Sequence, residues 1–287
     1  MGNKAMPGNN LPLMLESIYQ SLTNSEQRVA QTVLNDLEAA VFYTITDLAE
    51  KSNVGETTVI RLCRKLGFKG YQEFKLAIVQ NLSSPSKQIH GEIQESDTLM
   101  EIAEKLNNIN TQTIANTTKL LDEERLQGCL DALVNARKIY FFGVGSSGIT
   151  VESAKYRFMR MGFNVEAATD AHIIAMNAAV AGKGDVVFGI SASGSTKDLV
   201  DAVRIARQGG ATIICLTNHA RSPITQYADL ILISSAKENP LQMGAFASKI
   251  AQIHILDILC TALSVKHKDK VYNVLQKTAR SVSDKLY

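Results

Sequence analysis

Two stretches decide the fold: Lys138–Gly148 (KIYFFGVGSSG) and Asp185–Thr196 (DVVFGISASGST) repeat one design. In each, a short apolar run rich in β-forming residues ends in a loop of small residues, and a helical pattern follows. A loop of this kind presents backbone N–H groups and the positive end of a helix dipole to an anion. We therefore expect two phosphate-binding loops, with side-chain hydroxyls as further donors.

Strands and helices alternate around these two loops. The predicted strands lie near 138–143, 163–167, 185–191, 211–216 and 229–233. The predicted helices of the same region lie near 97–121, 122–136, 147–161, 172–180, 195–208, 244–265 and 268–283. The strand segments are apolar over almost their whole length, which is typical of strands buried on both faces of a parallel sheet. This region is therefore expected to be an α/β domain with a five-stranded parallel sheet.

The composition is that of an ordinary globular protein. The chain has 287 residues, 45% hydrophobic and 20% charged, with a formal net charge of +2, so it shows no general attraction to nucleic acid. Its four cysteines form no CxxC pair and no Cys/His cluster, which predicts buried free thiols, no metal site and a reducing, cytoplasmic location. No apolar stretch is expected to reach the length that crosses a bilayer. Residues 1–10 lack the apolar segment of a signal peptide.

A polar break at Ser83–Lys87 (SSPSK) separates the α/β region from an N-terminal part whose pattern is entirely helical. Its proline stops a helix, and its polar residues are typical of a linker. We divide the chain into an all-helical domain at 12–82, a linker at 83–96 and the α/β domain at 97–287.

One helix of the first domain opens at Ser25–Arg28 (SEQR). Ser25 is the candidate N-cap, and Arg28 stands at the third position after it, where a capping box would have Glu or Gln. The sequence therefore predicts an incomplete capping box at this helix.

The segment Thr46–Leu66 (TDLAEKSNVGETTVIRLCRKL) fits a helix-turn-helix. Ala49 stands where two helices must pack closely. Asn53 stands at the turn, where a residue that tolerates positive φ is required. The apolar residues that are spaced to form the shared core of the two helices are Leu48, Val54, Val59 and Leu62.

Short polar residues open the second helix of this motif, and basic residues follow. In a helix-turn-helix, the start of the second helix faces base edges in the major groove, while charges elsewhere anchor to phosphate. The alternative is a helical hairpin whose Arg and Lys side chains face solvent. The predicted base or nearby contacts are Glu56, Thr57, Thr58 and Arg61, and the predicted phosphate contacts are Arg64, Lys65 and Lys69.

The first loop alone also matches the G-x-G-x-x-G dinucleotide fingerprint, with Glu166 about 20 residues further on. Three features count against a dinucleotide. Ser146 and Ser147 supply hydroxyls that suit a phosphomonoester, the second loop repeats that chemistry, and helices precede the first strand. We therefore expect a phosphorylated small molecule and no cofactor.

The two loops, Gly143-x-Gly145-Ser146-Ser147 and Ser191-x-Ser193-Gly194-x-Thr196, resemble the phosphosugar loops of the SIS (sugar isomerase) domain. The N-terminal helices and Val59–Gly70 (VIRLCRKLGFKG) resemble the helix-turn-helix of the RpiR family of bacterial transcription regulators. The resemblance covers about residues 12–285 and is strongest to the amino-sugar-responsive NanR and MurR types. It implies a repressor of amino-sugar catabolism genes, in particular those for sialic acid.

The resemblance also implies an effector, best matched by N-acetylmannosamine 6-phosphate, with N-acetylmuramic acid 6-phosphate or another sugar phosphate as alternatives. His172 and Glu238 would bond sugar hydroxyls, and Lys249 would reach the ligand from its own or a partner subunit. A capping or core histidine, a solvated loop acid and an exposed lysine are the plainer alternatives. The residues that would bind the phosphate and its neighbouring oxygens are Ser146, Ser147, Ser191, Ser193 and Thr196.

SIS folds also serve isomerases, which need a general base near C1–C2 of the sugar. Only His172 and Glu238 are candidates, and no motif supports either, so we expect a sensor without catalytic residues. Helix-turn-helix regulators usually act as dimers on paired half-sites. The apolar segment 250–259 (IAQIHILDIL) is expected to pair subunits into a dimer or tetramer, to pack on the sheet, or to do both. The expected partners are an operator DNA, the effector and a second copy, with no membrane.

Overall fold

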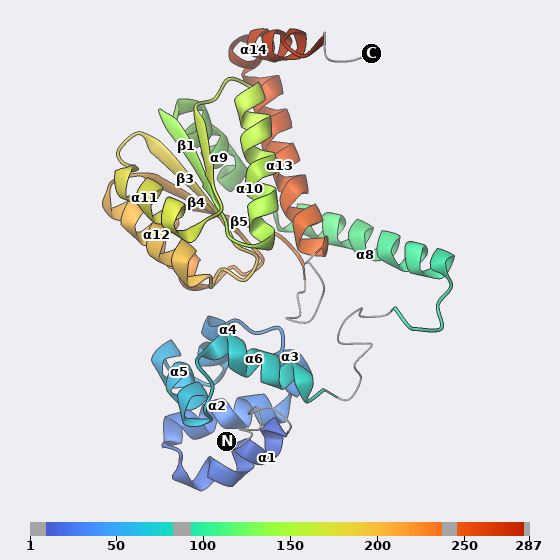
Figure 1. Ribbon diagram of the computed structural model, residues 1–287, viewed down its shortest axis with the longest axis vertical. Helices are drawn as coiled ribbons and strands as arrows, with labels where there is room; N and C mark the ends of the chain where they lie inside the picture. The colour runs from blue at the N-terminus through green and yellow to red at the C-terminus, as the bar shows by residue number, and fades with distance from the viewer. Residues whose placement is uncertain (1–9, 83–92, 237–245, 284–287) are drawn as a thin grey trace, which may run out of the picture. The chain divides into compact units, whose positions relative to one another are not determined.

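The structure is a computed structural model that describes residues 10–82, 93–236 and 246–283, except for the side chains of Phe246 and Lys270 (Figure 1). The described chain divides into two compact units, and the division falls after Ile109, within α8 (Leu99–Leu120). The N-terminal unit has one buried apolar cluster, and the C-terminal unit has two.

The N-terminal unit is entirely helical over its described residues, as predicted. Its elements are α1 (Leu11–Ile18), a 3-10 helix η1 (Tyr19–Ser21), α2 (Asn24–Asn35), α3 (Leu37–Ala40), α4 (Ile45–Lys51), α5 (Glu56–Lys65) and α6 (Tyr71–Gln80). Helix α2 packs against α3, α4 and α5, and its residues Val29, Ala30 and Val33 are fully buried. It therefore joins α3 to the two helices of the helix-turn-helix, α4 and α5.

Helices α4 and α5 form the predicted helix-turn-helix. Asn53 has a φ of +50°, the positive value that the turn requires. Ala49 is buried between the helices, and Val54 packs against their common core. The remaining predicted core residues, Leu48, Val59 and Leu62, are fully buried. The sequence prediction is confirmed for this motif.

The start of α2 differs from the prediction. Its N-cap is Thr23, whose hydroxyl accepts a hydrogen bond from the Glu26 amide at 3.4 Å. The Glu26 carboxylate in turn accepts one from the Thr23 amide at 2.9 Å, which completes a capping box. The prediction of Ser25 as N-cap of an incomplete box was wrong. The register that begins two residues earlier satisfies two backbone N–H groups, whereas Arg28 has no acceptor to offer.

The C-terminal unit contains the predicted five-stranded parallel sheet, in the order β2-β1-β3-β4-β5. The strands are β1 (Lys138–Phe142), β2 (Val165–Ala168), β3 (Asp185–Ile190), β4 (Thr212–Thr217) and β5 (Leu230–Ile233). From β1 the chain moves outward to β2, and from β3 it moves the other way to β4 and β5. The strand order therefore reverses between β1 and β3, where ligands bind in open α/β sheets.

Helices cover both faces of the sheet (Figure 1). One face carries α9 (Glu123–Asn135), α10 (Ser146–Arg160) and α13 (Phe246–Lys266), and α14 (Lys268–Arg280) packs beside them. The other face carries α11 (Ala171–Val180), α12 (Lys197–Gln208) and the 3-10 helix η2 (Pro223–Tyr227). Within β1, Ile139 and Phe141 face the first layer, and Tyr140 and Phe142 face the second. Burial on both faces explains the continuous apolar runs of the strands.

Helix α13 corrects one expectation. Residues Ala247–Lys266 are long and apolar enough, by length and composition alone, to cross a membrane. Ile255, Leu256 and Leu259 are nevertheless fully buried against the sheet, as in the core helix of a soluble protein. Of the two uses considered for the segment 250–259, the structure shows packing on the sheet.

The cysteines are free thiols, as predicted. Cys63, Cys129 and Cys215 are buried, and Cys260 is partly buried. Burial raises the pKa of Cys63 and of Cys129 to about 12, so both thiols stay protonated at neutral pH. Within the described residues, no group of three or more His, Cys, Asp or Glu side chains could hold a metal ion.

Candidate functional site

The two hydroxyl-rich loops leave the same edge of the sheet. β1 and β3 are neighbouring parallel strands, with Phe142 opposite Gly189, so the loops that follow them are brought together. Helix α10 begins directly after Gly145, and α12 begins directly after Thr196. Neither N-cap side chain accepts a hydrogen bond from its helix, because Gly145 has no side chain and Thr196 makes no such bond. The first-turn amides of both helices are therefore available to an anion.

Two glycines let the loops approach their neighbours closely. A Cβ atom on Gly143 would lie 2.9 Å from the Val151 side chain and 3.1 Å from the carbonyl oxygen of Ile190. Gly194 has a φ of +61°, and a Cβ atom there would lie 2.1 Å from Ser222 Oγ. Both positions exclude a side chain, which explains why glycine stands at these points of the pattern.

The second loop is held closed by its own hydroxyl groups. Ser191 Oγ accepts a hydrogen bond from the Gly194 amide at 3.0 Å and lies 3.3 Å from Thr196 Oγ1. Ser193 Oγ accepts from the Ser195 amide at 3.2 Å. The structure therefore brings together the predicted residues Ser191 and Thr196, in a loop whose shape is already set.

The first loop places its two serines differently. Ser146 is exposed at the first position of α10, and Ser147 is buried. Both lie at the helix start that faces the second loop across the β1–β3 pair. The predicted phosphate contacts thus gather at one edge of the sheet, although they come from two segments more than 40 residues apart.

The predicted sugar contacts lie on other elements. His172 is exposed in the first turn of α11, and its backbone amide donates to the Asp170 N-cap at 2.9 Å. Its imidazole is therefore neither a cap nor a core group. Lys249 is half-buried in the first turn of α13. Glu238 lies outside the described residues.

Sequence reasoning missed a polar cluster at the ends of β4 and β5. Asn218 Nδ2 donates to Ser248 Oγ on α13 at 2.8 Å, and Ser234 Oγ donates to Asn218 Oδ1 at 2.5 Å. The backbone N–H of Asn218 also donates to the carbonyl oxygen of Ala192 in the second loop at 3.0 Å. This cluster joins the second loop to the start of α13. The sequence did contain a signal for it, because Thr217 ends β4 and Asn218 follows the strand, much as the serine loops follow β1 and β3.

A buried pair links α10 to α13 one turn below. Thr150 Oγ1 donates to Gln252 Oε1 at 2.9 Å, and both side chains are buried. Gln252 Nε2 has no hydrogen-bond partner among the described residues. A buried donor of this kind is normally satisfied by a water or a ligand. Gln252 therefore joins the residues that could face a bound molecule.

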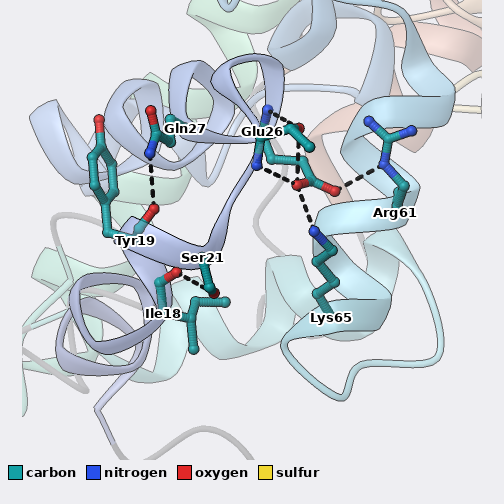
Figure 2. Close-up of polar contacts among 8 residues, drawn as sticks. Ile18, Tyr19, Ser21, Glu26, Gln27, Arg61 and Lys65 are labelled. Carbon is teal, nitrogen blue, oxygen red and sulfur yellow. Dashed lines mark hydrogen bonds and ion pairs between the residues drawn. The ribbon is translucent and has the colours of Figure 1, made fainter.

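The N-terminal unit has its own polar site around Glu26 of α2, which is fully buried (Figure 2). Arg61 Nε donates to Glu26 Oε1 at 2.8 Å, and Lys65 Nζ donates to Oε2 at 2.7 Å. The amide and the hydroxyl of Thr23 each donate to Oε2 at 2.9 Å. Burial by itself would raise the pKa of Glu26, but the hydrogen bonds from Lys65, Thr23 and Arg61 outweigh it and hold the pKa at about 2.

A second contact from α2 fixes the turn of the helix-turn-helix. Arg28 Nε donates to the carbonyl of Ser52 at 3.1 Å, and Arg28 Nη2 donates to the carbonyl of Asn53 at 3.2 Å. Helix α2 therefore binds both the turn of the motif, through Arg28, and its second helix, through Glu26. No simple pattern in the sequence indicates these contacts, since the partners are 24 to 39 residues apart.

The other predicted DNA contacts divide by exposure. Glu56 Oε1 accepts a hydrogen bond from Thr46 Oγ1 at 2.6 Å, so the Glu56 carboxylate is already bound to a side chain of α4. Thr58 is half-buried. The predicted residues whose side chains are exposed without a role in the Glu26 site are Thr57, Arg64 and Lys69.

Comparisons with known proteins match both units. The model of the helix-turn-helix domain of the rpiR family matches residues 9–85, and the SIS domain model matches residues 132–262. A Haemophilus influenzae protein named as an uncharacterized HTH-type transcriptional regulator is 39% identical over 266 residues, which cover 91% of this chain and 92% of that protein.

Solved structures agree with these matches. The Vibrio vulnificus NanR protein complexed with ManNAc-6P is 30% identical, with a TM-score of 0.87 over 97% of this chain and 100% of that one. Phosphoheptose isomerase GmhA from Neisseria gonorrhoeae is 19% identical, with a TM-score of 0.52 over 58% of this chain and 99% of that one. At this identity, the second likeness shows the fold alone.

The buried carboxylate predicts a specific pH dependence of stability. A carboxyl whose pKa falls on folding stabilises the native state above its unfolded pKa of about 4.5, and this stabilisation is lost as the pH falls toward 2. Glu26→Gln should therefore unfold more easily than the native protein at neutral pH, and the difference should shrink between pH 4.5 and 2. Urea unfolding of both proteins across this range measures it. A difference that stayed constant with pH would contradict the assignment.

Proposed function

Because the chain belongs to the RpiR family of helix-turn-helix transcription regulators that carry a SIS domain, we propose that it is a repressor whose DNA binding is modulated by a phosphorylated amino sugar. Our best candidate for the effector is N-acetylmannosamine 6-phosphate, which would place the regulated genes in sialic acid catabolism. The similarity to the NanR protein complexed with ManNAc-6P supports this choice over the whole chain. N-acetylmuramic acid 6-phosphate is the alternative effector.

The observation that carries the proposal is the pair of uncapped helix starts at the β1–β3 edge. A phosphate there would accept hydrogen bonds from the first backbone N–H groups of α10 and α12, and the dipoles of the two helices would stabilise its negative charge. We propose that Ser146 and Ser147 bind it from the first loop. The hydroxyl groups proposed to bind it from the second loop are those of Ser191, Ser193 and Thr196.

The sugar would extend from the phosphate toward α11 and α13. We propose that His172 bonds a sugar hydroxyl, since its imidazole is exposed, and that Lys249 and Glu238 contribute further contacts. The polar cluster at Asn218 and Ser248 braces the start of α13 against the second loop. A ligand that binds both the second loop and the start of α13 would therefore contact two segments that are already joined by hydrogen bonds.

We propose a sensor rather than an enzyme. Two of the similar proteins, from Haemophilus influenzae and Caldanaerobacter subterraneus, are named as HTH-type transcriptional regulators. The DNA-binding domain gives phosphosugar binding a use without turnover. The likeness of the SIS fold to isomerases supports the alternative of a phosphosugar isomerase. A coupled assay with sugar phosphates and no DNA separates the two, because only an isomerase would form product.

We propose that residues 12–82 read DNA, that 83–96 link the domains and that 97–287 bind the effector, in a cytoplasmic protein. A dimer would present two helix-turn-helix domains to the paired half-sites of an operator. Exposed apolar side chains occur on α10 and on α11, which cover opposite faces of the sheet, and we propose that either set could contact a second copy. They are Ile149, Tyr156, Met159, Ile173, Met176 and Val180.

The effector proposal predicts the effect of Ser193→Ala. Loss of one hydrogen bond to a charged phosphate should lower the affinity for N-acetylmannosamine 6-phosphate by about tenfold or more, and DNA binding without effector should be unchanged. Titration calorimetry measures the affinity. The matched control is Ser195→Ala in the same loop, whose hydroxyl donates to the Ser193 carbonyl instead. Equal affinities of the native protein and the Ser193 variant would remove this hydroxyl from the site.

The DNA proposal predicts the effect of Arg64→Ala. This exposed residue should bind phosphate, so its loss should weaken binding to all duplexes and reduce the slope of log K against log salt by about 1. Arg61→Ala would also weaken binding, but it removes a partner of the buried Glu26 as well. Lys51→Ala on α4 is the control. The probe is a duplex selected from a random pool by the native protein, and an unchanged slope would count against Arg64.

A further inference from the structure

We propose that Glu26 is a positioning residue for DNA recognition: it orients the guanidinium of Arg61 toward a guanine edge and withholds Lys65 from the phosphate backbone. The inference rests on the proposed role of α5 as the helix that reads DNA. Glu26 itself lies on α2 and is fully buried, so it acts only through the two side chains that it binds.

The carboxylate of Glu26 is fully engaged on its own side of the interface. Its Oε1 atom accepts from Arg61, while its Oε2 atom accepts from Lys65 and twice from Thr23. A buried charge persists only when such partners satisfy it. The two cations on α5 are therefore bound in the free protein, before any DNA is present.

The ion pair with Glu26 leaves the two terminal nitrogens of the Arg61 guanidinium available for another contact. The contact with Glu26 uses Nε, and Figure 2 shows the two terminal nitrogens turned away from the carboxylate. Its side chain is 52% exposed. Because the guanidinium is planar, a bond at Nε fixes the direction of the remaining fork. Fewer rotamers are then lost on binding, which favours affinity.

The position of this fork suits a base. Arg61 lies one helical turn after the exposed Thr57, on the side of α5 that a helix-turn-helix turns toward the major groove. The major-groove edge of guanine offers two acceptors, O6 and N7, which match a guanidinium fork. A phosphate also offers paired oxygens, and the experiment below separates it from guanine.

Lys65 is bound in the opposite way. Its ammonium group is a single point of charge, and that group lies 2.7 Å from Glu26 Oε2. The two N–H groups left over lie on the same nitrogen and cannot extend toward DNA while the ion pair is kept, whereas Arg61 has two further nitrogens that can. We assign Lys65 to holding α5 on α2, which leaves the exposed Arg64 and Lys69 as phosphate contacts.

Two substitutions separate this role from simple helix capping. Glu26→Gln keeps the capping box, since Gln also serves at its third position, but it removes the charge that orients Arg61. Thr23→Ala does the reverse, because it removes the capping hydroxyl and keeps the carboxylate with both cations. If Glu26 only stabilises α2, both variants should read DNA alike once their stability is allowed for.

The test uses full-length proteins and the duplex that the native protein selects from a random pool. Each guanine is replaced in turn by 7-deazaguanine, which lacks the N7 acceptor. We expect the native protein and Thr23→Ala to lose about tenfold in affinity at one guanine. Glu26→Gln and Arg61→Met should lose that sensitivity, because neither presents an oriented guanidinium to N7, and Lys65→Met should keep it with an unchanged salt slope.

The outcomes are distinct. Retained sensitivity in either Glu26→Gln or Arg61→Met would overturn the inference, as would a native protein with no sensitive guanine, which would point to phosphate. If Glu26→Gln does not fold, Glu26→Asp takes its place with the same expected loss, because the shorter side chain keeps the charge but draws the carboxylate away from Arg61. A native protein that selects no duplex at all would refute the proposed function instead.

Discussion

The parallel pairing of β1 with β3 is the constraint on which the effector site depends. Because the two strands are neighbours and run in the same direction, the loops that follow them must meet at one edge. The chain then departs from β1 and β3 in opposite directions across the sheet, which makes this edge the point at which open α/β sheets bind ligands. The helices that start there, α10 and α12, lie on opposite faces of the sheet, and both begin at this edge.

Helix N-termini are used in two ways in this protein. At α2, the orphan N–H groups are satisfied from within the chain by the capping box of Thr23 and Glu26, and the same carboxylate binds two cations of α5. At α10 and α12, the N-cap side chains make no such bond. The first arrangement neutralises an anion that belongs to the fold. The second is suited to an anion that comes from outside, such as the proposed phosphate.

Much of the fold could be predicted from local patterns. The five strands, the positive φ of Asn53 and the serine loops all followed from short segments, because apolar periodicity, glycine and hydroxyl residues act over a few positions. The predicted phosphate contacts Ser191 and Thr196 lie together for the same reason, since one loop contains both. The error at Ser25 was also local: two candidate caps stood two residues apart, and only one had a carboxylate in register.

The sequence by itself determined the class of each domain, the order of its elements and the chemistry of the two loops. Only the tertiary structure decided which charges are engaged. Arg61 and Lys65 looked alike as basic residues of one helix, yet both bind the buried Glu26 of α2, with different donors left over. Asn218 likewise joins three segments that the sequence separates. The physical reason is range: backbone preferences act between near neighbours, whereas a buried charge or amide is satisfied by whatever the fold brings to it.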